Sequence, residues 1–212
     1  MYDRHREMMV QKYVIDAGIT DARVIAAMRK IPRHLFVETA IRHQAYMDKS
    51  LPIGFGQTIS HPTTVASMTQ LLALNGSEKI LEIGTGSGYQ AAVLAEVGVK
   101  VYTIERIAEL ARRAQQMFDQ LGYYTIGIRI GDGSVGWSNH APYDRIIVTA
   151  ASPEVPQTLA KQLGENGKLI VPVGDKVQQK LMIVTRQGNN FDIIEADSRS
   201  FVPLIGKRGW AD

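Results

Sequence analysis

The chain has 212 residues, of which 45% are hydrophobic and 21% are charged, so it is long and apolar enough to bury the core of a folded domain. It contains no cysteine, which excludes disulfides, thiolate metal sites and cysteine nucleophiles. The formal net charge is +3, but the basic residues are spread along the chain, so no nucleic-acid surface is expected. No apolar run reaches the length of a signal or membrane-spanning segment, so a soluble cytoplasmic protein is expected.

The N-terminal part of the chain is predicted to be helical and then irregular. Thr20 or Asp21 can accept hydrogen bonds at the start of a helix that continues to Lys30, and Pro32 ends this helix. The prolines and glycines of residues 41–60 predict an irregular segment after it.

A second helix is predicted to begin at Pro62 and to end near Leu74, because proline fits the first position of a helix. Ser60 is therefore expected just before a helix N-terminus. The pair Asn75-Gly76 follows this helix, and succinimide formation is chemically easy at such a flexible pair. Self-damage at position 75 is therefore a further hypothesis.

From residue 79 onward, short runs of Val, Ile and Leu alternate with helical patterns, which indicates a parallel sheet covered by helices on both faces. Two later strand-like runs are separated by a turn that leaves no room for a crossover helix, so they are predicted to be antiparallel. The predicted elements are, in chain order, 79–83, 90–96, 100–104, 108–121, 125–130, 145–149, 156–163 and 168–172, followed by the two antiparallel strands 180–186 and 191–196.

The predicted architecture is a doubly wound, mostly parallel α/β sheet with an N-terminal helical extension and antiparallel C-terminal strands. We expect a single domain over residues 1–212. Its expected parts are a helical extension with an active-site loop (1–77), a cofactor-binding α/β core (78–197) and a C-terminal tail (198–212).

A glycine-rich run at residues 82–88 joins the first strand of the predicted sheet to the helix that follows it. In open α/β sheets, ligands bind beyond the carboxyl ends of the strands, at a turn of this kind. Its glycines allow positive φ and close approach of the main chain to a ligand, and the following helix points free N–H groups at the same place. Taken alone, the run also suits a tight turn without a ligand. The predicted ligand contacts are Gly84, Thr85, Gly86, Ser87 and Gly88.

The residues around this loop favour one nucleoside over others. Glu105 ends the second strand of the sheet 21 residues after Gly84, where a carboxylate can accept both ribose hydroxyls of an adenosine, with Arg106 beside it. A dinucleotide motif would require glycine or alanine where this chain has Tyr89. Glu82 places a carboxylate where it would repel a pyrophosphate and attract the ammonium group of a methionine moiety. S-adenosylmethionine is therefore the predicted cofactor.

A second acid is expected at the same edge of the sheet. The segment Gly131-Asp132-Gly133 follows the third strand of the sheet, so the Asp132 carboxylate is placed to accept from the adenine amino group, with Gly133 next to it. An aspartate in such a segment is more often a turn residue, but Glu82 and Glu105 make the ligand interpretation the favoured one.

These residues resemble the class I S-adenosylmethionine-dependent methyltransferases, which have a Rossmann-like sheet. Within that class the chain resembles the protein-L-isoaspartate (D-aspartate) O-methyltransferase family along nearly its whole length. The sequence departs from the family pattern at His61 and Ile205. The segments that carry the resemblance are IPRHLFV (31–37), QTISHP (57–62), LGENGKLIVPVG (163–174) and FVPL (201–204), together with YDRIIVTAA (143–151).

The resemblance implies methyl esterification of the α-carboxylate that becomes free when Asn or Asp rearranges to isoaspartate. The ester recyclises to a succinimide, so the reaction initiates repair of damaged peptides and proteins, and the product of the cofactor is S-adenosylhomocysteine. Ser60 is implied as the catalytic residue, and Ile59 and Ser60 as cofactor contacts. The alternative for Ser60 is an ordinary helix-capping serine. The implied peptide contacts are Thr58, Ile59, Ser60, Val202, Pro203 and Leu204.

A carboxylate acceptor is already ionised at pH 7, so the reaction needs no general base. This agrees with the sequence, because His34, His43 and His140 have no spacing typical of ligands and are interpreted as structural or surface residues. No metal site is predicted. A monomer is expected, with isoaspartyl peptides and proteins as the only partners.

Three other functions remain open from the residues alone. A class I methyltransferase that acts on RNA or on a small molecule would share the whole cofactor argument. An NAD(P) oxidoreductase is disfavoured by Tyr89 and Glu82, and a non-catalytic nucleoside-binding module is the third alternative.

Overall fold

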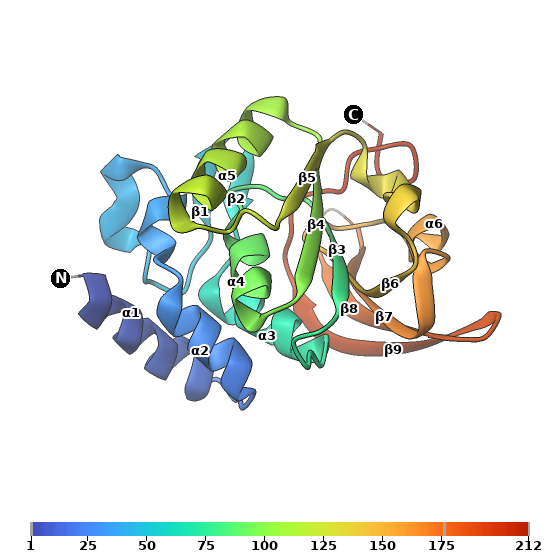
Figure 1. The fold of residues 1–212 in the computed structure, drawn as a ribbon, viewed down its shortest axis with the longest axis horizontal. Coiled ribbons are helices and arrows are strands. Elements are labelled where there is room, and N and C mark those ends of the chain that lie inside the picture. The colour runs from blue at the N-terminus through green and yellow to red at the C-terminus, as the bar shows by residue number, and fades with distance from the viewer. Residues whose placement is uncertain (1, 176, 212) are drawn as a thin grey trace.

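The computed structural model describes residues 2–175 and 177–211. A seven-stranded sheet runs through the molecule in the spatial order β5-β4-β3-β6-β7-β8-β9 (Figure 1). A separate two-stranded sheet, β1-β2, lies in the N-terminal part of the chain. The strands of the large sheet are β3 (Lys79–Ile83), β4 (Lys100–Glu105), β5 (Gly127–Ile130), β6 (Tyr143–Val148), β7 (Leu163–Gly174), β8 (Gln179–Gln187) and β9 (Asn190–Arg199).

The pairing of the strands confirms the predicted fold class. Strand β3 pairs in parallel with β4 on one side and with β6 on the other, so that Ile80 lies opposite Val101 and Arg145. The parallel pairing continues through β5 and β7. Strands β8 and β9 then form antiparallel pairs, as the short turn between them predicts. Because β4 and β5 extend the sheet to one side of β3 and β6 to the other, the strand order reverses beside β3.

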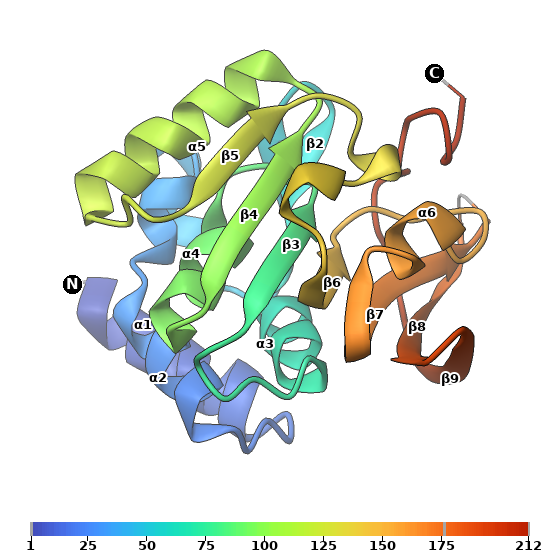
Figure 2. The same ribbon diagram turned by 45° about the vertical axis from the view of Figure 1, so that its right-hand side comes forward.

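Alternate residues of the central strands enter two different hydrophobic cores. Ile80, Ile147 and Ile170 pack with the N-terminal helices, α4 and α5, whereas their neighbours Leu81 and Ile146 pack with α6 on the opposite face. Figure 2 shows the strands side by side, with α5 along one edge and α6 beside β7. The larger helices are α1 (Tyr2–Val10), α2 (Ala22–Lys30), α3 (Pro62–Leu71), α4 (Tyr89–Val97) and α5 (Ala108–Leu121); α6 (Gln157–Ala160) is short.

The predicted N-terminal cap of α2 is confirmed. The Asp21 side chain accepts hydrogen bonds from the main-chain N–H groups of Arg23 (2.8 Å) and Val24 (3.3 Å). The helix ends at Lys30, and Ile31 is extended (ψ 121°), as expected of a residue before proline. The N-terminal segment also contains a π-helical turn, η1 (Gln11–Ile15), between α1 and α2.

The segment that was predicted to be irregular contains a β-hairpin. Strands β1 (Leu51–Gly54) and β2 (Gln57–Ile59) are antiparallel, and the turn between them places Phe55 and Gly56 at φ 55° and 68°. These strands are too short for an alternating pattern to show in the sequence. Helix α3 begins at Pro62 as predicted, but it ends at Leu71, earlier than the predicted position near residue 74.

Two C-terminal boundaries also differ from the prediction. Helix α6 ends at Ala160 rather than near residue 163, and β7 already begins at Leu163 rather than at residue 168. The early part of β7 contains an irregularity in its pairing with β6 at residues 164–167, where Asn166 has φ 57° and an added Cβ at Gly167 would lie 2.9 Å from the carbonyl oxygen of Gly164. The sequence signalled only the apolar run after this irregularity.

The turn that contains Asn75 and Gly76 is held by one carboxylate. Glu78 accepts hydrogen bonds from the main-chain N–H groups of Asn75 (2.8 Å), Gly76 (3.0 Å) and Ser77 (3.1 Å). The Asn75 side-chain oxygen in turn accepts from the Ser77 hydroxyl at 2.6 Å. Self-damage at Asn75 stays a prediction, which mass spectrometry of aged protein tests by the presence or absence of isoaspartate at this position.

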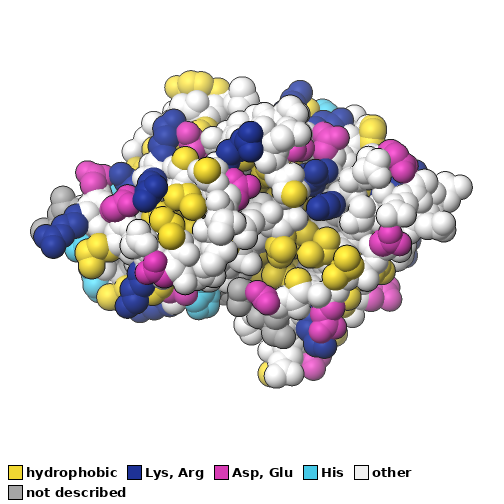
Figure 3. Space-filling view, turned by 90° about the horizontal axis from the view of Figure 1, so that it is seen from below, with side chains coloured by type: hydrophobic (Ala, Val, Ile, Leu, Met, Phe, Trp, Pro, Cys, Tyr) yellow, Lys and Arg dark blue, Asp and Glu magenta, His cyan; other side chains and the backbone are white. Residues whose placement is uncertain are grey.

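On the face drawn in Figure 3, Lys and Arg side chains lie among acidic and apolar side chains rather than in one large group. No helix within residues 2–175 and 177–211 is both long enough and apolar enough to cross a membrane. The same described residues contain no group of three or more His, Asp or Glu side chains placed to hold a metal ion.

Candidate active site

A pocket lies at the carboxyl ends of β3, β4 and β6, beside the point where the strand order reverses. Counted with its open mouth, the pocket encloses about 850 Å³. Of the predicted residues, Glu82, Gly88 and Asp132 do not line it. The predicted residues that do line it are Thr58, Ile59, Ser60, Gly84, Thr85, Gly86, Ser87, Glu105, Arg106, Gly133, Val202, Pro203 and Leu204.

The glycine loop follows a path that only glycine permits at two positions. Gly84 and Gly88 have φ values of 95° and 89°. An added Cβ at Gly84 would lie 2.5 Å from Thr149 Oγ1, and one at Gly88 would lie 2.7 Å from the Phe118 ring. Thr149 Oγ1 is also within hydrogen-bond distance of the carbonyl oxygens of Ile83 (3.0 Å) and Gly84 (2.7 Å). The end of β6 therefore fixes the loop that closes one side of the pocket.

Glu105 lies against this loop, as its spacing predicts. Its Oε2 accepts from the Gly86 N–H at 2.8 Å, and its Oε1 accepts from the Ile107 N–H at 2.9 Å. The side chain lines the pocket although only 6% of the residue is exposed. Each carboxylate oxygen keeps a further lone pair after one such bond, so Glu105 can still accept from the two hydroxyls of a ribose.

Glu82 is buried beneath the loop. Thr103 Oγ1 donates to Glu82 Oε2 at 2.5 Å and lies 2.7 Å from Thr85 Oγ1, so a hydrogen-bonded chain joins the loop to the acid. Glu82 Oε1 has no partner in the described part of the chain. Burial raises the pKa of Glu82 to about 8, and the charge of Glu105 adds to the rise while the Thr103 bond opposes it. This rise favours the uncharged acid at pH 7 in the absence of a ligand, and the attraction between its charge and a ligand ammonium group stays a prediction.

Asp132 holds the C-terminal tail. Its Oδ1 accepts from the N–H and the hydroxyl of Ser134 at 2.8 and 2.6 Å, and its Oδ2 accepts from the Lys207 N–H at 2.9 Å. The Arg208 N–H donates to the Ser134 hydroxyl at 3.0 Å. The side chain that was predicted to meet the adenine amino group thus engages the tail, and Gly133 lines the pocket at this position.

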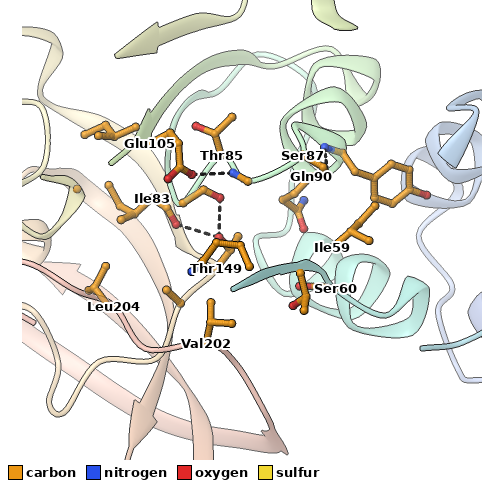
Figure 4. A pocket seen from close by; sticks show the side chains of 18 of the residues that line it. Ile59, Ser60, Ile83, Thr85, Ser87, Gln90, Glu105, Thr149, Val202 and Leu204 are labelled. Carbon is orange, nitrogen blue, oxygen red and sulfur yellow. Dashed lines mark hydrogen bonds between the residues drawn. The ribbon is translucent and has the colours of Figure 1, made fainter. Parts of the chain in front are cut away.

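Ser60 enters the pocket between the end of β2 and the start of α3. Helix α3 has His61 as its N-terminal cap, without a capping side-chain bond, so the alternative of Ser60 as an ordinary capping serine does not describe the structure. The Ser60 carbonyl oxygen accepts from Arg33 Nη2 at 2.7 Å. Figure 4 shows Ser60, Thr149 and Val202 around the same pocket, and these side chains come from three distant segments.

The tail reaches the pocket through a short parallel bridge. The Ala151 N–H donates to the carbonyl oxygen of Val202, and the Leu204 N–H donates to the carbonyl oxygen of Ala151, both at 2.7 Å. Pro203 lies between these bonds and has no N–H of its own. The main-chain groups of Val202 and Leu204 that were predicted for peptide pairing are therefore partly used by Ala151.

Sequence reasoning missed lining residues that come from helices. Gln90, in the first turn of α4, donates from Nε2 to Thr69 Oγ1 at 2.9 Å and lines the pocket. Its position directly after a glycine loop is a signal that would have found it. Thr64, Val65 and Met68 of α3 also line the pocket, and no motif in the sequence marks them.

The sheet order and the position of this pocket are those of the Rossmann-like fold of class I methyltransferases. A family model described as protein-L-isoaspartate(D-aspartate) O-methyltransferase matches residues 4–209. The chain belongs to this family, and it is an O-methyltransferase; the predicted family and fold class are confirmed.

Curated relatives match over nearly the whole chain. A protein-L-isoaspartate O-methyltransferase 1 of Syntrophobacter fumaroxidans is 51% identical over 209 residues, which cover 99% of this chain and 98% of the relative. A protein-L-isoaspartate O-methyltransferase of Methanoculleus marisnigri is 49% identical over 207 residues, with 98% and 94% covered.

Solved structures agree with these relatives. A protein-L-isoaspartate O-methyltransferase structure matches 96% of this chain and 67% of its own chain, with a TM-score of 0.88 and 28% identity. A structure from Plasmodium falciparum, described as a complex with S-adenosyl-L-homocysteine, matches 94% of this chain and 98% of its own, with a TM-score of 0.83 and 23% identity, and so supports the fold.

Proposed function

We propose that this chain transfers the methyl group of S-adenosylmethionine to the free α-carboxylate of L-isoaspartyl residues in damaged peptides and proteins, and so initiates their repair through a succinimide. One observation carries the proposal beyond family membership. The glycine loop and Glu105 share a single pocket with Ser60 and with the tail residues Val202 and Leu204. The residues predicted to bind the nucleoside therefore line the same pocket as the residues predicted to bind the acceptor.

The pocket fits S-adenosylmethionine. Gly84 lines the pocket with no side chain between its main chain and a ligand, and its left-handed φ and the nearby Thr149 require glycine there. Glu105 has lone pairs for the ribose hydroxyls, and Ile104 and Leu204 supply apolar surface for a base. When bound, S-adenosylmethionine supplies an electrophilic methyl group on a sulfonium.

The acceptor needs orientation rather than activation. An α-carboxylate has a reference pKa of about 3.3–3.7 and is ionised at pH 7, so no residue has to remove a proton from it. One carboxylate oxygen forms the new bond to the methyl carbon as the bond from that carbon to sulfur breaks, and an anion and a cation become neutral products. Such a step is favoured by a site that excludes water and holds the reactants in line.

Ser60 is the residue that we assign to this orientation. Its hydroxyl is not used to cap α3, so it is available to donate to one oxygen of the acceptor carboxylate. Thr58 and Ile59 precede it on β2, and both line the pocket. Pro203 also lines the pocket, and main-chain contacts there would suit an enzyme that reads the peptide main chain, which is common to all sequences.

The first test is the acceptor itself. The enzyme should transfer labelled methyl from S-adenosylmethionine to an isoaspartyl peptide and not to the aspartyl peptide of the same sequence. A D-aspartyl peptide in the same assay measures the second acceptor in the family description. Equal labelling of the isoaspartyl and aspartyl peptides, or labelling of RNA alone, would contradict the proposal. Calorimetric titration that finds tight NAD binding and no S-adenosylmethionine binding would also contradict it.

The second test is Ser60→Ala. Loss of a hydrogen bond to a charged group costs about 1.5–3 kcal/mol, so turnover on the isoaspartyl peptide should fall about 10- to 150-fold while cofactor affinity survives. Ser138, an exposed serine outside the pocket, offers the matched control Ser138→Ala, which should leave turnover unchanged. Unchanged turnover in Ser60→Ala would remove the serine from the mechanism.

We further propose that the protein acts in the cytoplasm as a monomer. The absence of cysteine from the sequence suits a reducing compartment, where disulfides do not persist. Light scattering of the purified protein tests the monomer, and a mass twice that of the chain would contradict it.

A further inference from the structure

Arg33 is a buried guanidinium that contacts separate segments around the pocket. It begins the short 3-10 helix η2 (Arg33–Phe36), directly after the proline that ends α2, and none of it is exposed. Its Nε donates to the Ala45 carbonyl oxygen at 2.8 Å, and its Nη2 donates to the Ser60 carbonyl oxygen at 2.7 Å. Its guanidinium carbon lies 4.8 Å from the centroid of the Tyr89 ring.

This charge is buried without a carboxylate in contact. Arg33 forms no ion pair with any acid in the described part of the chain. Asp48 is the acid whose charge acts on it, and Asp48 itself accepts from the Thr63 N–H at 3.0 Å at the start of α3. Burial of a charge costs several kcal/mol, and apolar side chains of similar volume often stabilise a fold equally well. The desolvation cost of the charge therefore offsets part of what its hydrogen bonds to main-chain carbonyls contribute to stability.

The contacts of Arg33 also join the two sides of the pocket. The Ser60 carbonyl belongs to the segment between β2 and α3 that delivers the serine. Tyr89 is the first residue of α4 and follows the glycine loop directly. Both residues line the pocket, whereas Arg33 lies behind them. The guanidinium is thus a fixed spacer between the serine segment and the helix that follows the cofactor loop.

We propose that Arg33 is a positioning residue for methyl transfer, which holds the Ser60 main chain at a fixed distance from α4 and so sets the gap between methyl donor and acceptor carboxylate. This inference rests on the proposed function, because that function assigns the acceptor to Ser60. A displacement of about 1 Å between reacting groups costs about 100-fold in rate. The planar guanidinium donates to the carbonyls of Ala45 and Ser60 and packs against the Tyr89 ring. The single ammonium group of lysine does not reproduce this geometry.

The experiment compares Arg33→Lys with the wild-type enzyme on an isoaspartyl peptide. The kcat should fall about 10- to 100-fold in the folded variant, while KM for the peptide and the calorimetric Kd for S-adenosylmethionine change little. Arg33→Gln keeps an amide N–H donor without a buried charge, and it should lose kcat in the same way. Circular dichroism measures the folded fraction, to which each kcat is normalised.

Arg145 provides a matched control. It also donates to main-chain carbonyls, from Nε to Leu72 at 2.6 Å and from Nη1 to Asp144 at 2.8 Å. It lies near the amino end of β6, whereas the pocket is at the carboxyl end of that strand. Arg145→Lys should lower the Tm and leave kcat unchanged, since its contacts support the fold and not the site.

A double variant separates positioning from a general loss of order. If Arg33 acts through Ser60, adding Arg33→Lys to Ser60→Ala should reduce kcat no further, because the group being positioned is already absent. Independent effects would instead multiply in the double variant.

The results that overturn the inference are distinct from those that overturn the proposed function. Wild-type kcat in folded Arg33→Lys, or multiplied losses in the double variant, would overturn the positioning role alone. Failure of both Arg33→Lys and Arg33→Gln to fold would show that the residue serves the fold, and it would overturn the role as well. A wild-type enzyme that does not methylate the isoaspartyl peptide would instead refute the proposed function.

Discussion

The two walls of the pocket are built differently. The cofactor wall, defined as residues 84–87 with Glu105 and Gly133, consists of loops that leave the ends of adjacent strands in one sheet. The acceptor wall, defined as Ser60 with residues 202–204, consists of a hairpin end and a tail. Hydrogen bonds from Arg33 and Ala151 hold these two segments. The cofactor wall is therefore part of the sheet, whereas the acceptor wall is attached to it by a few contacts.

This difference predicts how each wall should fail. A change in the cofactor wall should disturb both the fold and cofactor binding, because the same main chain serves both. A change in the acceptor wall should lower turnover or peptide affinity while the sheet and the cofactor site remain intact.

The largest effect is expected from Gly88→Val in the loop that carries the cofactor wall. The residue has a left-handed φ, and an added Cβ would lie 2.7 Å from the Phe118 ring. The substitution should therefore lower the free energy of unfolding by about 2–5 kcal/mol and abolish cofactor binding. Thermal unfolding and calorimetric titration measure both effects. Gly188→Val is the control, because Gly188 has φ 60° but no atom within 4 Å of an added Cβ, so it shows the backbone cost alone. Equal losses in the two variants would contradict the role of Phe118.

The next effect is expected from Glu105→Gln. Loss of a charged acceptor for the ribose hydroxyls should weaken S-adenosylmethionine binding by about 1.5–3 kcal/mol, or about 10- to 150-fold. Glu109→Gln, on the exposed surface of α5 beside Arg112 and Arg113, should leave the affinity unchanged. Calorimetric titration of both variants with S-adenosylmethionine is the measurement. Equal affinities of the two variants would show that Glu105 does not bind the ribose.

The sequence predicted the cofactor wall because its spacing is set by regular elements. A strand, a glycine turn and a helix recur at fixed lengths, so the glycine loop and Glu105 were expected at one edge of the sheet, where the Gly86 N–H donates to Glu105. The position of a loop residue in three dimensions also depends on side chains that spacing does not reveal. Glu82 lies one position before the end of β3, and burial there raises its pKa. Asp132 accepts from a tail 75 residues away, which no local pattern signals.

The acceptor wall was predicted only through resemblance to a family. The hairpin of β1 and β2 is too short for its alternation to be read, and its turn requires a non-glycine residue, Phe55, at positive φ. The bond from Arg33 to Ser60 joins residues 27 positions apart in irregular segments, so periodicity carries no information about it. Such long-range contacts of single side chains could not be predicted from the sequence.

A smaller effect is expected from Gly206→Ala in the tail beyond the acceptor wall. An added Cβ at Gly206 would lie 2.2 Å from Asp132 Oδ1 and 2.6 Å from the Ser134 hydroxyl, so the tail should lift from both. Loss of the hydrogen bonds from Lys207 and Arg208 should weaken the attachment of the tail by about 1 kcal/mol. The peptide KM should therefore rise about 5- to 10-fold. Gly188→Ala is the matched control, and steady-state kinetics on the isoaspartyl peptide is the measurement. A KM equal to that of the control would show that the tail does not support peptide binding.

The smallest effect on activity is expected from Glu82→Gln, which tests whether the cofactor wall depends on charge. Because burial raises the pKa of Glu82 to about 8, the side chain is already neutral at pH 7, and glutamine should leave cofactor affinity close to that of the wild type. A large loss of affinity at pH 7 would instead show that the carboxylate binds as a charged group.

The same variant should differ from the wild type in the pH dependence of its stability. Between the ordinary pKa of 4.5 and the folded pKa of about 8, folded Glu82 keeps a proton that the unfolded chain has lost. The free energy of unfolding of the wild type should therefore fall as pH rises through this range, by at most about 1.4 kcal/mol per pH unit for this group. Glutamine has no such proton. The Tm of Glu82→Gln relative to that of the wild type should therefore rise from pH 5 to pH 8, and the difference between the two Tm values should stay constant above pH 8. Parallel Tm profiles would show that Glu82 titrates normally. Glu82 would then be charged at pH 7, as the sequence predicts.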